Sequence, residues 1–353
     1  MLKKIKWAVI PGVVVLGLIL QALASTALPP LESTVGEFTV DKGNPNYAIP
    51  ITTPPGTAGK VPQLSLGYSR SADSSLAGSN FTLNGLSAVT RCPKTIALDG
   101  VRGGVNYDSD DRFCLDAQRL IVVQGSYGAD GTEYRTERET FSRIYSYGSQ
   151  GGGPQSFKVH AKDGSVTEYG VTEDSRIEAS GKSVVRLWAM NKSLDVMGNY
   201  YAVTYTEDNP NGDYRPERID YTGNTAAGLT PYNKVQFEYE SRPDIATRYE
   251  GGSVMRTTQR LKNIQTLADS TLTREYRLNY DASGALVDPS VPKPGLEGWS
   301  WTSSVRRVDD GGSNFMADVN GDGKKDHVFV APEGAPNARA VHVGLSANGG
   351  FEG

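Results

Sequence analysis

Residues 157–169 read FKVHAKDGSVTEY, and this stretch decides the fold class. Apolar residues alternate with polar ones from Phe157 to Ala161, and the alternation resumes from Val166 to Tyr169 after an Asp163-Gly164 pair. A period of two is typical of a half-buried β-strand, and an Asp-Gly pair favours a tight turn between antiparallel strands. The stretch therefore predicts a β-hairpin.

The same alternation recurs along the chain. It is found at Tyr201, Val203 and Tyr205, at Val235, Phe237 and Tyr239, and at Tyr276, Leu278 and Tyr280. The stretch from Arg119 to Val123 predicts a further strand, and outside the amino-terminal residues no helical pattern exceeds about three turns. We therefore predict an all-β protein dominated by an extended antiparallel sheet.

The composition agrees with this fold class. The 353 residues include 40 glycines and 19 prolines, and only 38% are hydrophobic, which argues against a thick core of buried helices. The 18 tyrosines suit half-buried strand faces, where we expect the ring to pack and the hydroxyl to stay in water. Because 36 basic residues face 40 acidic ones, no basic excess favours nucleic acid as a partner.

The first residues predict export. Lys3, Lys4 and Lys6 precede an apolar run at 7–20, and Ala22-Leu23-Ala24 offers a cleavage site, which is typical of a signal peptide over 1–24. The alternative is an uncleaved anchor, because the run approaches the roughly 18 to 20 residues that span a bilayer; Pro11 and Gly12 favour cleavage. Losing three lysines changes the net charge from −4 to −7. We expect an acidic extracellular or cell-surface protein without membrane affinity after cleavage.

Cys92 and Cys114 are the only cysteines of the chain. In an oxidising compartment they predict a disulfide, which closes a loop of 21 intervening residues and contributes roughly 3 kcal/mol in the loop-entropy model. The alternative is a catalytic thiol, which needs a histidine partner. The three histidines, His160, His327 and His342, are far from either cysteine in sequence, which favours the disulfide.

Several motifs, in a fixed order, resemble one known family. They occupy residues 43–51, 54–59, 62–68, 85–92, 111–120, 219–224, 237–244 and 260–264. This series is similar to the SpvB/TcaC-type amino-terminal domain of Salmonella plasmid virulence protein B and of Tc toxin B subunits, over roughly residues 35–280. Two shorter pieces, DVMGNY at 195–200 and YDASG at 280–284, resemble Rhs/YD-repeat proteins. There the glycine would serve a turn that needs a positive φ.

The resemblance implies a scaffold. In Tc B subunits this region contributes to a hollow β shell that encloses an effector, so the partners would be other toxin-complex subunits or a carboxyl-terminal effector, with a host surface as a further candidate. We expect a secreted, non-catalytic delivery region with an SpvB-like β domain over 35–287. A linker with three prolines follows at 288–300, then a partial repeat at 301–353. Since the repeat stops at Gly353, we expect a fragment or a truncated product.

The stretch from 318 to 326 predicts a structural Ca²⁺ site. Hard Ca²⁺ is bound by six to eight oxygens from alternate positions of a tight loop. The ligands would be Asp318, Asn320, Asp322, the Lys324 carbonyl and Asp326. An EF-hand would need a glutamate where Phe329 stands, and the segment instead resembles an FG-GAP/VCBS repeat, a propeller-type blade. The alternative is an Asp/Asn/Gly-rich turn without an ion.

We predict no catalytic residue. The chain lacks G-x-S-x-G, H-E-x-x-H and a P-loop. Glu137-Arg138-Glu139 has the E-x-E spacing of arginine-directed ADP-ribosyltransferases, but we interpret it as a solvated loop edge, and Asp108, Asp110 and Asp111 as turn caps. The alternatives to a scaffold are a cell-surface adhesin or glycan-binding module, and an exported hydrolase.

Overall fold

The computed structural model describes residues 36–41, 44–69 and 75–280, together with strands at 286–287, 313–317, 326–330, 341–347 and 350–352. All of them belong to the second of the chain's two units, Thr34–Gly353. The predicted signal peptide at 1–24 and linker at 288–300 lie outside the described residues. The helices of the described part are short: α1 (Ile96–Asp99) and three 3-10 turns, η1 (Thr57–Gly59), η2 (Glu173–Ser175) and η3 (Asn209–Asn211). The other regular elements are strands, so the all-β prediction is confirmed.

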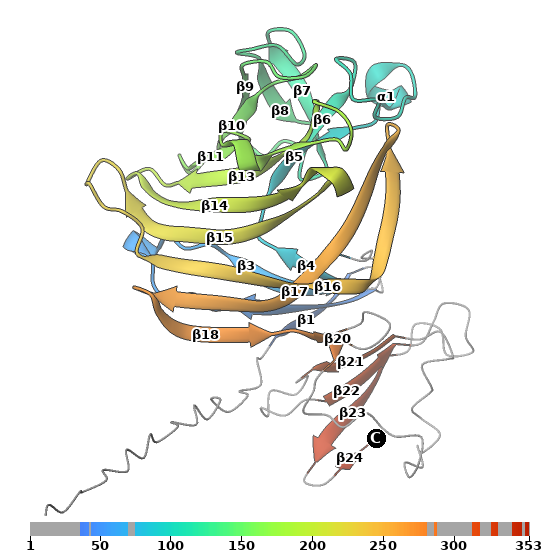
Figure 1. Cartoon of the computed structure of the whole chain (residues 1–353), viewed down its shortest axis with the longest axis vertical. Helices are drawn as coiled ribbons and strands as arrows, with labels where there is room; N and C mark the ends of the chain where they lie inside the picture. Colours follow the sequence, from blue (N-terminus) through green and yellow to red (C-terminus); the bar gives the residue numbers. More distant parts are fainter. Residues whose placement is uncertain are drawn as a thin grey trace, which may run out of the picture. The chain divides into compact units, whose positions relative to one another are not determined.

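Eight strands close into an antiparallel barrel, drawn in cyan to green in Figure 1. They are β5 (Ala88–Cys92), β6 (Arg112–Leu115), β7 (Gln118–Gln124), β8 (Glu133–Thr136), β9 (Arg143–Tyr147), β10 (Ser156–His160), β11 (Val166–Tyr169) and β13 (Val185–Leu194). Neighbours in the chain pair in sequence, and β13 closes the ring because it pairs with both β11 and β5. Strand periodicity did not indicate this closure.

An open sheet starts from the other edge of Lys192–Leu194, the residues of β13 that also pair with β11. The sheet continues through β14 (Asn199–Asp208), β15 (Asp213–Asn224), β16 (Asn233–Glu250), β17 (Ser253–Ala268) and β18 (Thr271–Arg277), while β12 (Arg176–Glu178) pairs with the start of β13. The strands of the β16–β17 hairpin are 18 and 16 residues long. Figure 1 shows this hairpin as the long pair of strands that reaches from the sheet toward the α1 end of the barrel.

A separate four-stranded antiparallel sheet packs on the open sheet. It consists of β1 (Glu37–Asp41), β2 (Asn44–Ile51), β3 (Leu64–Ser69) and β4 (Phe81–Asn84). Hydrogen bonds join the two sheets: Thr52 N donates to Tyr276 Oη at 2.8 Å, and Tyr221 Oη donates to Pro54 O at 3.0 Å. Leu64 shares one core with Phe237, so the two sheets cover each other's apolar faces.

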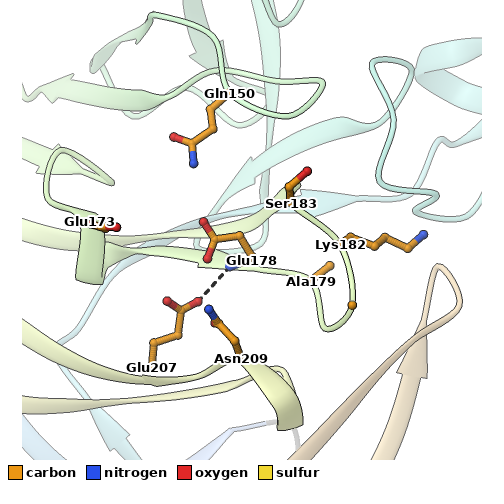
Figure 2. A pocket seen from close by; sticks show the side chains of 9 residues that line it. Gln150, Glu173, Glu178, Ala179, Lys182, Ser183, Glu207 and Asn209 are labelled. Carbon is orange, nitrogen blue, oxygen red and sulfur yellow. Dashed lines mark hydrogen bonds between the residues drawn. The ribbon is translucent and has the colours of Figure 1, made fainter.

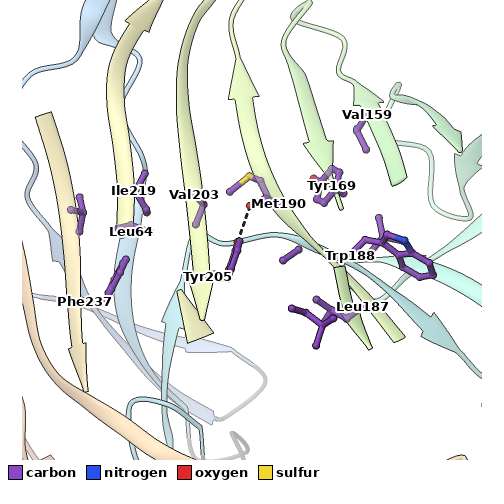
Figure 3. Packing of buried hydrophobic residues seen from close by; sticks show 14 of the residues in the cluster. Leu64, Val159, Tyr169, Leu187, Trp188, Met190, Val203, Tyr205, Ile219 and Phe237 are labelled. Atoms are coloured by element: carbon purple, nitrogen blue, oxygen red, sulfur yellow. Dashed lines mark hydrogen bonds between the residues drawn. The ribbon is translucent and has the colours of Figure 1, made fainter. Parts of the chain in front are cut away.

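One apolar core runs from the barrel into the sheets (Figure 3). Trp188 on β13 is fully buried inside the barrel, where its ring meets Phe113 at 5.4 Å and Phe157 at 5.1 Å in edge-to-face contacts. Its Nε1 donates to Pro154 O at 3.1 Å. Because β13 belongs to both the barrel and the open sheet, packing around Trp188 holds the two parts together.

The predicted hairpins are confirmed. Strands β10 and β11 pair from Phe157–Tyr169 to His160–Val166, around a turn in which Gly164 has φ +82°. Between β13 and β14, Gly198 has φ +80°, as the resemblance to repeat proteins implied. Here the Asp195 carboxylate accepts hydrogen bonds from the Met197 and Asn199 amides, both at 2.9 Å, which fixes the turn.

The tyrosines differ from expectation. Tyr221 and Tyr134 are fully buried, and Tyr205 and Tyr239 donate to backbone carbonyls at 2.8 Å and 2.5 Å instead of to water. A buried phenol needs a hydrogen-bond partner, and carbonyls left free at irregular strand positions supply it. Burial raises the pKa of Tyr221 to about 12, which keeps its hydroxyl a donor.

The carboxyl-terminal strands form sheets of their own. β19 (Asn279–Tyr280) pairs with β20 (Leu286–Val287), and β21 (Ser313–Ala317), β22 (Asp326–Val330), β23 (Val341–Ala347) and β24 (Gly350–Glu352) form a four-stranded antiparallel sheet. β22 begins at Asp326, the last of the predicted Ca²⁺ ligands. Its membership of a propeller blade stays a prediction.

Candidate functional site

A polar cavity of about 520 Å³ lies between the end of β12, the end of β14 and the loop at 179–184 (Figure 2). Its lining is Gln150, Glu173, Glu178, Ala179, Gly181, Lys182, Ser183, Glu207 and Asn209. Three of these side chains are glutamates, and they come from β12, η2 and β14. The cavity therefore brings together acidic groups that are separated along the chain.

Glu207 and Glu178 face each other in this cavity. Glu178 N donates to Glu207 Oε1 at 3.1 Å, which is the dashed line in Figure 2. Burial raises the pKa of Glu207 to about 7, and the nearby Glu178 carboxyl adds to the rise. The hydrogen bond from Glu178 N lowers the pKa of Glu207 but does not offset these two effects. Two carboxyls this close cannot both ionise without repulsion. Glu207 can therefore take up or release a proton near neutral pH.

The neighbouring lysine does not neutralise this pair by a direct bond. Lys182 Nζ donates to Gly251 O at 2.9 Å and stacks over the Tyr107 ring at 5.2 Å. Sequence reasoning missed the glutamate pair, because Glu178 and Glu207 are 29 positions apart and neither belongs to a motif. Only the pairing of β12 and β14 with their neighbours brings the two residues together.

The aspartates considered for a glycosidase have structural partners. Asp111 is buried and pairs with Arg91 at 3.1 Å, while its two oxygens accept from the Asn106 and Tyr107 amides, each at 2.8 Å. Asp110 lies at the surface, where it pairs with Lys94 and Arg112, and the Asp108 carbonyl accepts from Arg91 at 2.7 Å. These contacts fit the interpretation of the aspartates as turn caps.

The E-x-E motif lies on the surface. Glu137, Arg138 and Glu139 are all exposed in the loop between β8 and β9. Glu139 Oε1 accepts from Phe141 N at 2.5 Å, a contact that shapes the loop itself. The loop does not line the cavity that contains Glu178 and Glu207, which agrees with a solvated loop edge.

The disulfide predicted from the sequence is present. Cys92 on β5 and Cys114 on β6 are bonded, with Cα atoms 5.9 Å apart. The loop between them carries α1, whose Asp99 accepts from Arg112 and Arg119, each at 2.7 Å. Burial alone would raise the pKa of Asp99, but hydrogen bonds from Thr95 and from these two guanidiniums lower it below its usual range. The loop is thus held by a covalent bond and by ion pairs.

The predicted Ca²⁺ ligands cannot be placed. Asp318, Asn320, Asp322 and Lys324 lie outside the described residues, and Asp326 is described only as the first backbone position of β22. Within the described residues, no group of three or more His, Cys, Asp or Glu side chains is arranged to hold a metal ion. The calcium site stays a prediction from the sequence. Likewise, no helix in the described part is long and apolar enough to cross a membrane.

Comparison with protein families gives one match. Residues 39–226 match the family described as "SpvB: Salmonella virulence plasmid 65kDa B protein", which covers more than half of the chain. The match includes β2 to β15, and so the whole barrel, both cysteines and the Glu178–Glu207 pair. No curated protein sequence matches the chain.

Solved structures share the fold. The N-terminal domain of the effector protein SpvB from Salmonella typhimurium strain LT2 aligns with a TM-score of 0.52 and 17% identity, over 65% of this chain and 93% of that domain. A Photorhabdus luminescens Tc holotoxin pore structure aligns at 0.57 and 18% identity, over 71% of this chain and 15% of that chain. The crystal structure of TcdB2-TccC3-TEV aligns at 0.58 and 16% identity, over 90% and 20%. The chain thus spans no more than a fifth of these two toxin chains.

Proposed function

This chain belongs to the SpvB family, and we propose that it is a non-catalytic scaffold region of an exported bacterial toxin of the Tc or Rhs type. The observation that carries the proposal is the family match over 39–226, in a chain whose barrel and open sheet have the fold of Tc toxin chains. In this role the sheets would form part of a β shell around an effector. The partners would be the remaining subunits of the toxin complex or the effector itself.

The contacts of Asp99 and Asp111 argue against the use of these two carboxylates in a hydrolase. Asp111 is held by Arg91 and by two backbone amides, and Asp99 is held by two arginines, so these carboxylates stabilise loops at the end of the barrel. A catalytic carboxylate has to reach its substrate in a cleft. Export of the mature chain and structural Ca²⁺ binding at 318–326 belong to the same proposal, and they are supported by the sequence patterns alone.

The test is assembly. The full chain is co-expressed with the other subunits of a Tc-type toxin, and the mixture is separated by size-exclusion chromatography. We expect the chain to elute with them as one complex, in which the effector resists added protease. The matched control is Trp188→Ala, which disrupts the shared core and should abolish co-elution.

Two results would overturn the scaffold proposal. One is elution of the wild-type chain by itself, together with specific binding on a glycan array, which would favour the adhesin. The other is turnover of a glycan or ester substrate by the purified chain, which would favour the hydrolase. Reading the gene beyond the codon for Gly353 adds an independent check, because a scaffold should continue into further repeats and an effector.

A further inference from the structure

Four segments meet at the tip of the β16–β17 hairpin. Tyr107, from the loop between β5 and β6, donates to Glu250 Oε2 at 2.8 Å, and Lys182 donates to Gly251 O at 2.9 Å. The loop at 179–184 also touches the turn between β14 and β15, where Ser180 Oγ donates to Pro210 O at 3.1 Å. These polar bonds join the barrel loops to the hairpin tip, which is one end of an 18-residue strand. We call this meeting point the junction.

The junction contains two acidic groups in unfavourable surroundings. Glu207 contacts Glu178, the last residue of β12 before the loop at 179–184, since it accepts from Glu178 N at 3.1 Å and faces the Glu178 carboxyl. Asp213, the first residue of β15, is only 9% exposed, and its Oδ2 has no hydrogen-bond partner in the described part. Ser253, at the start of β17, is 3% exposed and its hydroxyl likewise lacks a described partner.

Charges from every surrounding element act on these two carboxyls. The charges of Glu178 on β12 and Arg186 on β13 act on the Glu207 carboxyl, and Glu173 of η2, Lys182 and Asn209 line the same cavity. The charges of Arg186, Arg215 on β15 and Asp208 on β14 act on the Asp213 carboxyl. Arg186 also donates to Gly212 O at 2.7 Å, so this guanidinium is already engaged by the turn. Acidic groups therefore outnumber the cations that could neutralise them.

We propose that the junction is an acid-strengthened clasp, in which protonation of Glu207 and Asp213 tightens the bonds between the barrel loops and the β16–β17 tip, and ionisation loosens them. The inference goes beyond the scaffold role and does not depend on it. When both carboxyls ionise, Glu207 and Glu178 repel each other across the cavity, and Asp213 carries a buried charge without a full set of partners. Separation of the loop at 179–184 from the hairpin tip lets more water reach Glu207, which is already partly exposed, and Asp213.

The direction of the effect follows from proton linkage. Burial raises the pKa of Glu207 to about 7 and that of Asp213 to about 6, above ordinary values of 4.5 and 3.8. The closed junction therefore binds more protons than the open one between those limits. Closure is most favourable below about pH 4, where both carboxyls are protonated in either state, and the junction weakens as the pH rises from about 4 to about 7.

Hydrogen exchange on the full chain tests the clasp. Protection factors, corrected for the intrinsic rate at each pH, are measured for segments 179–184 and 250–253 at about pH 5.5 and about pH 8. We expect about tenfold lower protection at the higher pH in the wild type, a value reduced from the full linkage effect because Glu207 is partly exposed. Glu207→Gln removes this ionisable group and keeps the shape, so its loss of protection between the two pH values should be smaller than in the wild type, with only the part due to Asp213 left.

The matched control is Glu217→Gln, an equal chemical change at an exposed position of β15. This variant should respond to pH as the wild type does. If Glu207→Gln fails to fold, Asp213→Asn provides the second measurement and should also reduce the pH response. Equal protection at both pH values in the wild type would overturn the clasp. So would an unchanged response in Glu207→Gln, or a loss of protection spread over the whole barrel.

Discussion

Replacement of Trp188 by phenylalanine should destabilise the chain by about 3 kcal/mol. The indole is fully buried and its Nε1 donates to the carbonyl of buried Pro154 at 3.1 Å. A phenyl ring cannot make this bond, and an unsatisfied buried carbonyl costs about 1 to 3 kcal/mol. The smaller ring also leaves a cavity that costs about 1 kcal/mol. Trp188→Ala, which in addition loses the edge-to-face contacts with Phe113 and Phe157, should cost about 5 kcal/mol.

Urea denaturation followed by far-ultraviolet circular dichroism measures these costs without relying on the fluorescence of the replaced residue. The control is Phe141→Ala, an aromatic truncation at a side chain that is 67% exposed, which should change the free energy of unfolding by less than about 0.5 kcal/mol. A cost below about 1 kcal/mol for Trp188→Phe, with Trp188→Ala no worse than the control, would refute the role of Trp188 in joining the barrel to the sheet.

Three further predictions concern the loops. Cys92→Ser with Cys114→Ser should lower the free energy of unfolding by about 3 kcal/mol, and a reducing agent should then have no further effect on the melting temperature; a wild-type chain indifferent to reduction would contradict this. Asp99→Asn should cost about 3 kcal/mol at neutral pH, because two arginines lose their counter-charge. The pKa of Asp99 is lowered in the fold, so the wild type should lose the stability that ionised Asp99 contributes as the pH falls below 3.8. Chemical denaturation between pH 7 and about 3 should therefore show a shrinking difference in the free energy of unfolding between the wild type and Asp99→Asn. Removal of Ca²⁺ with a chelator should lower the melting temperature of the full chain, and Asp322→Ala should abolish that response; no shift in either experiment would exclude the calcium site.

Much of the fold was predictable from local patterns. The alternation at 157–169 indicated β10, β11 and their turn, and Gly164 and Gly198 adopt the positive φ that the turns require. The disulfide was predictable because the chain has only two cysteines. The strands and turns depend on residues near one another in sequence, and the disulfide depends on the chain having two cysteines that can pair within it.

The candidate site was not predictable in the same way. The aspartates at 108–111 stood out in the sequence because they are adjacent, yet Arg91 and backbone amides engage Asp111. Glu178 and Glu207 gave no signal, because an isolated glutamate on a strand is ordinarily a solvated residue. Their raised proton affinity comes from burial and from each other, and both depend on the packing of β12 against the end of β14.

The sequence by itself determined that the chain consists of strands and turns, that Cys92 can bond only with Cys114, and that the domain belongs with SpvB-type proteins. Only the tertiary structure decided that β13 closes a barrel by pairing Trp188 with Val89, 99 positions earlier, and that two glutamates share a cavity. The reason is physical. A period of two shows that a strand has an apolar face, but every strand has two edges, and the choice of neighbour is made by the packing of the whole core.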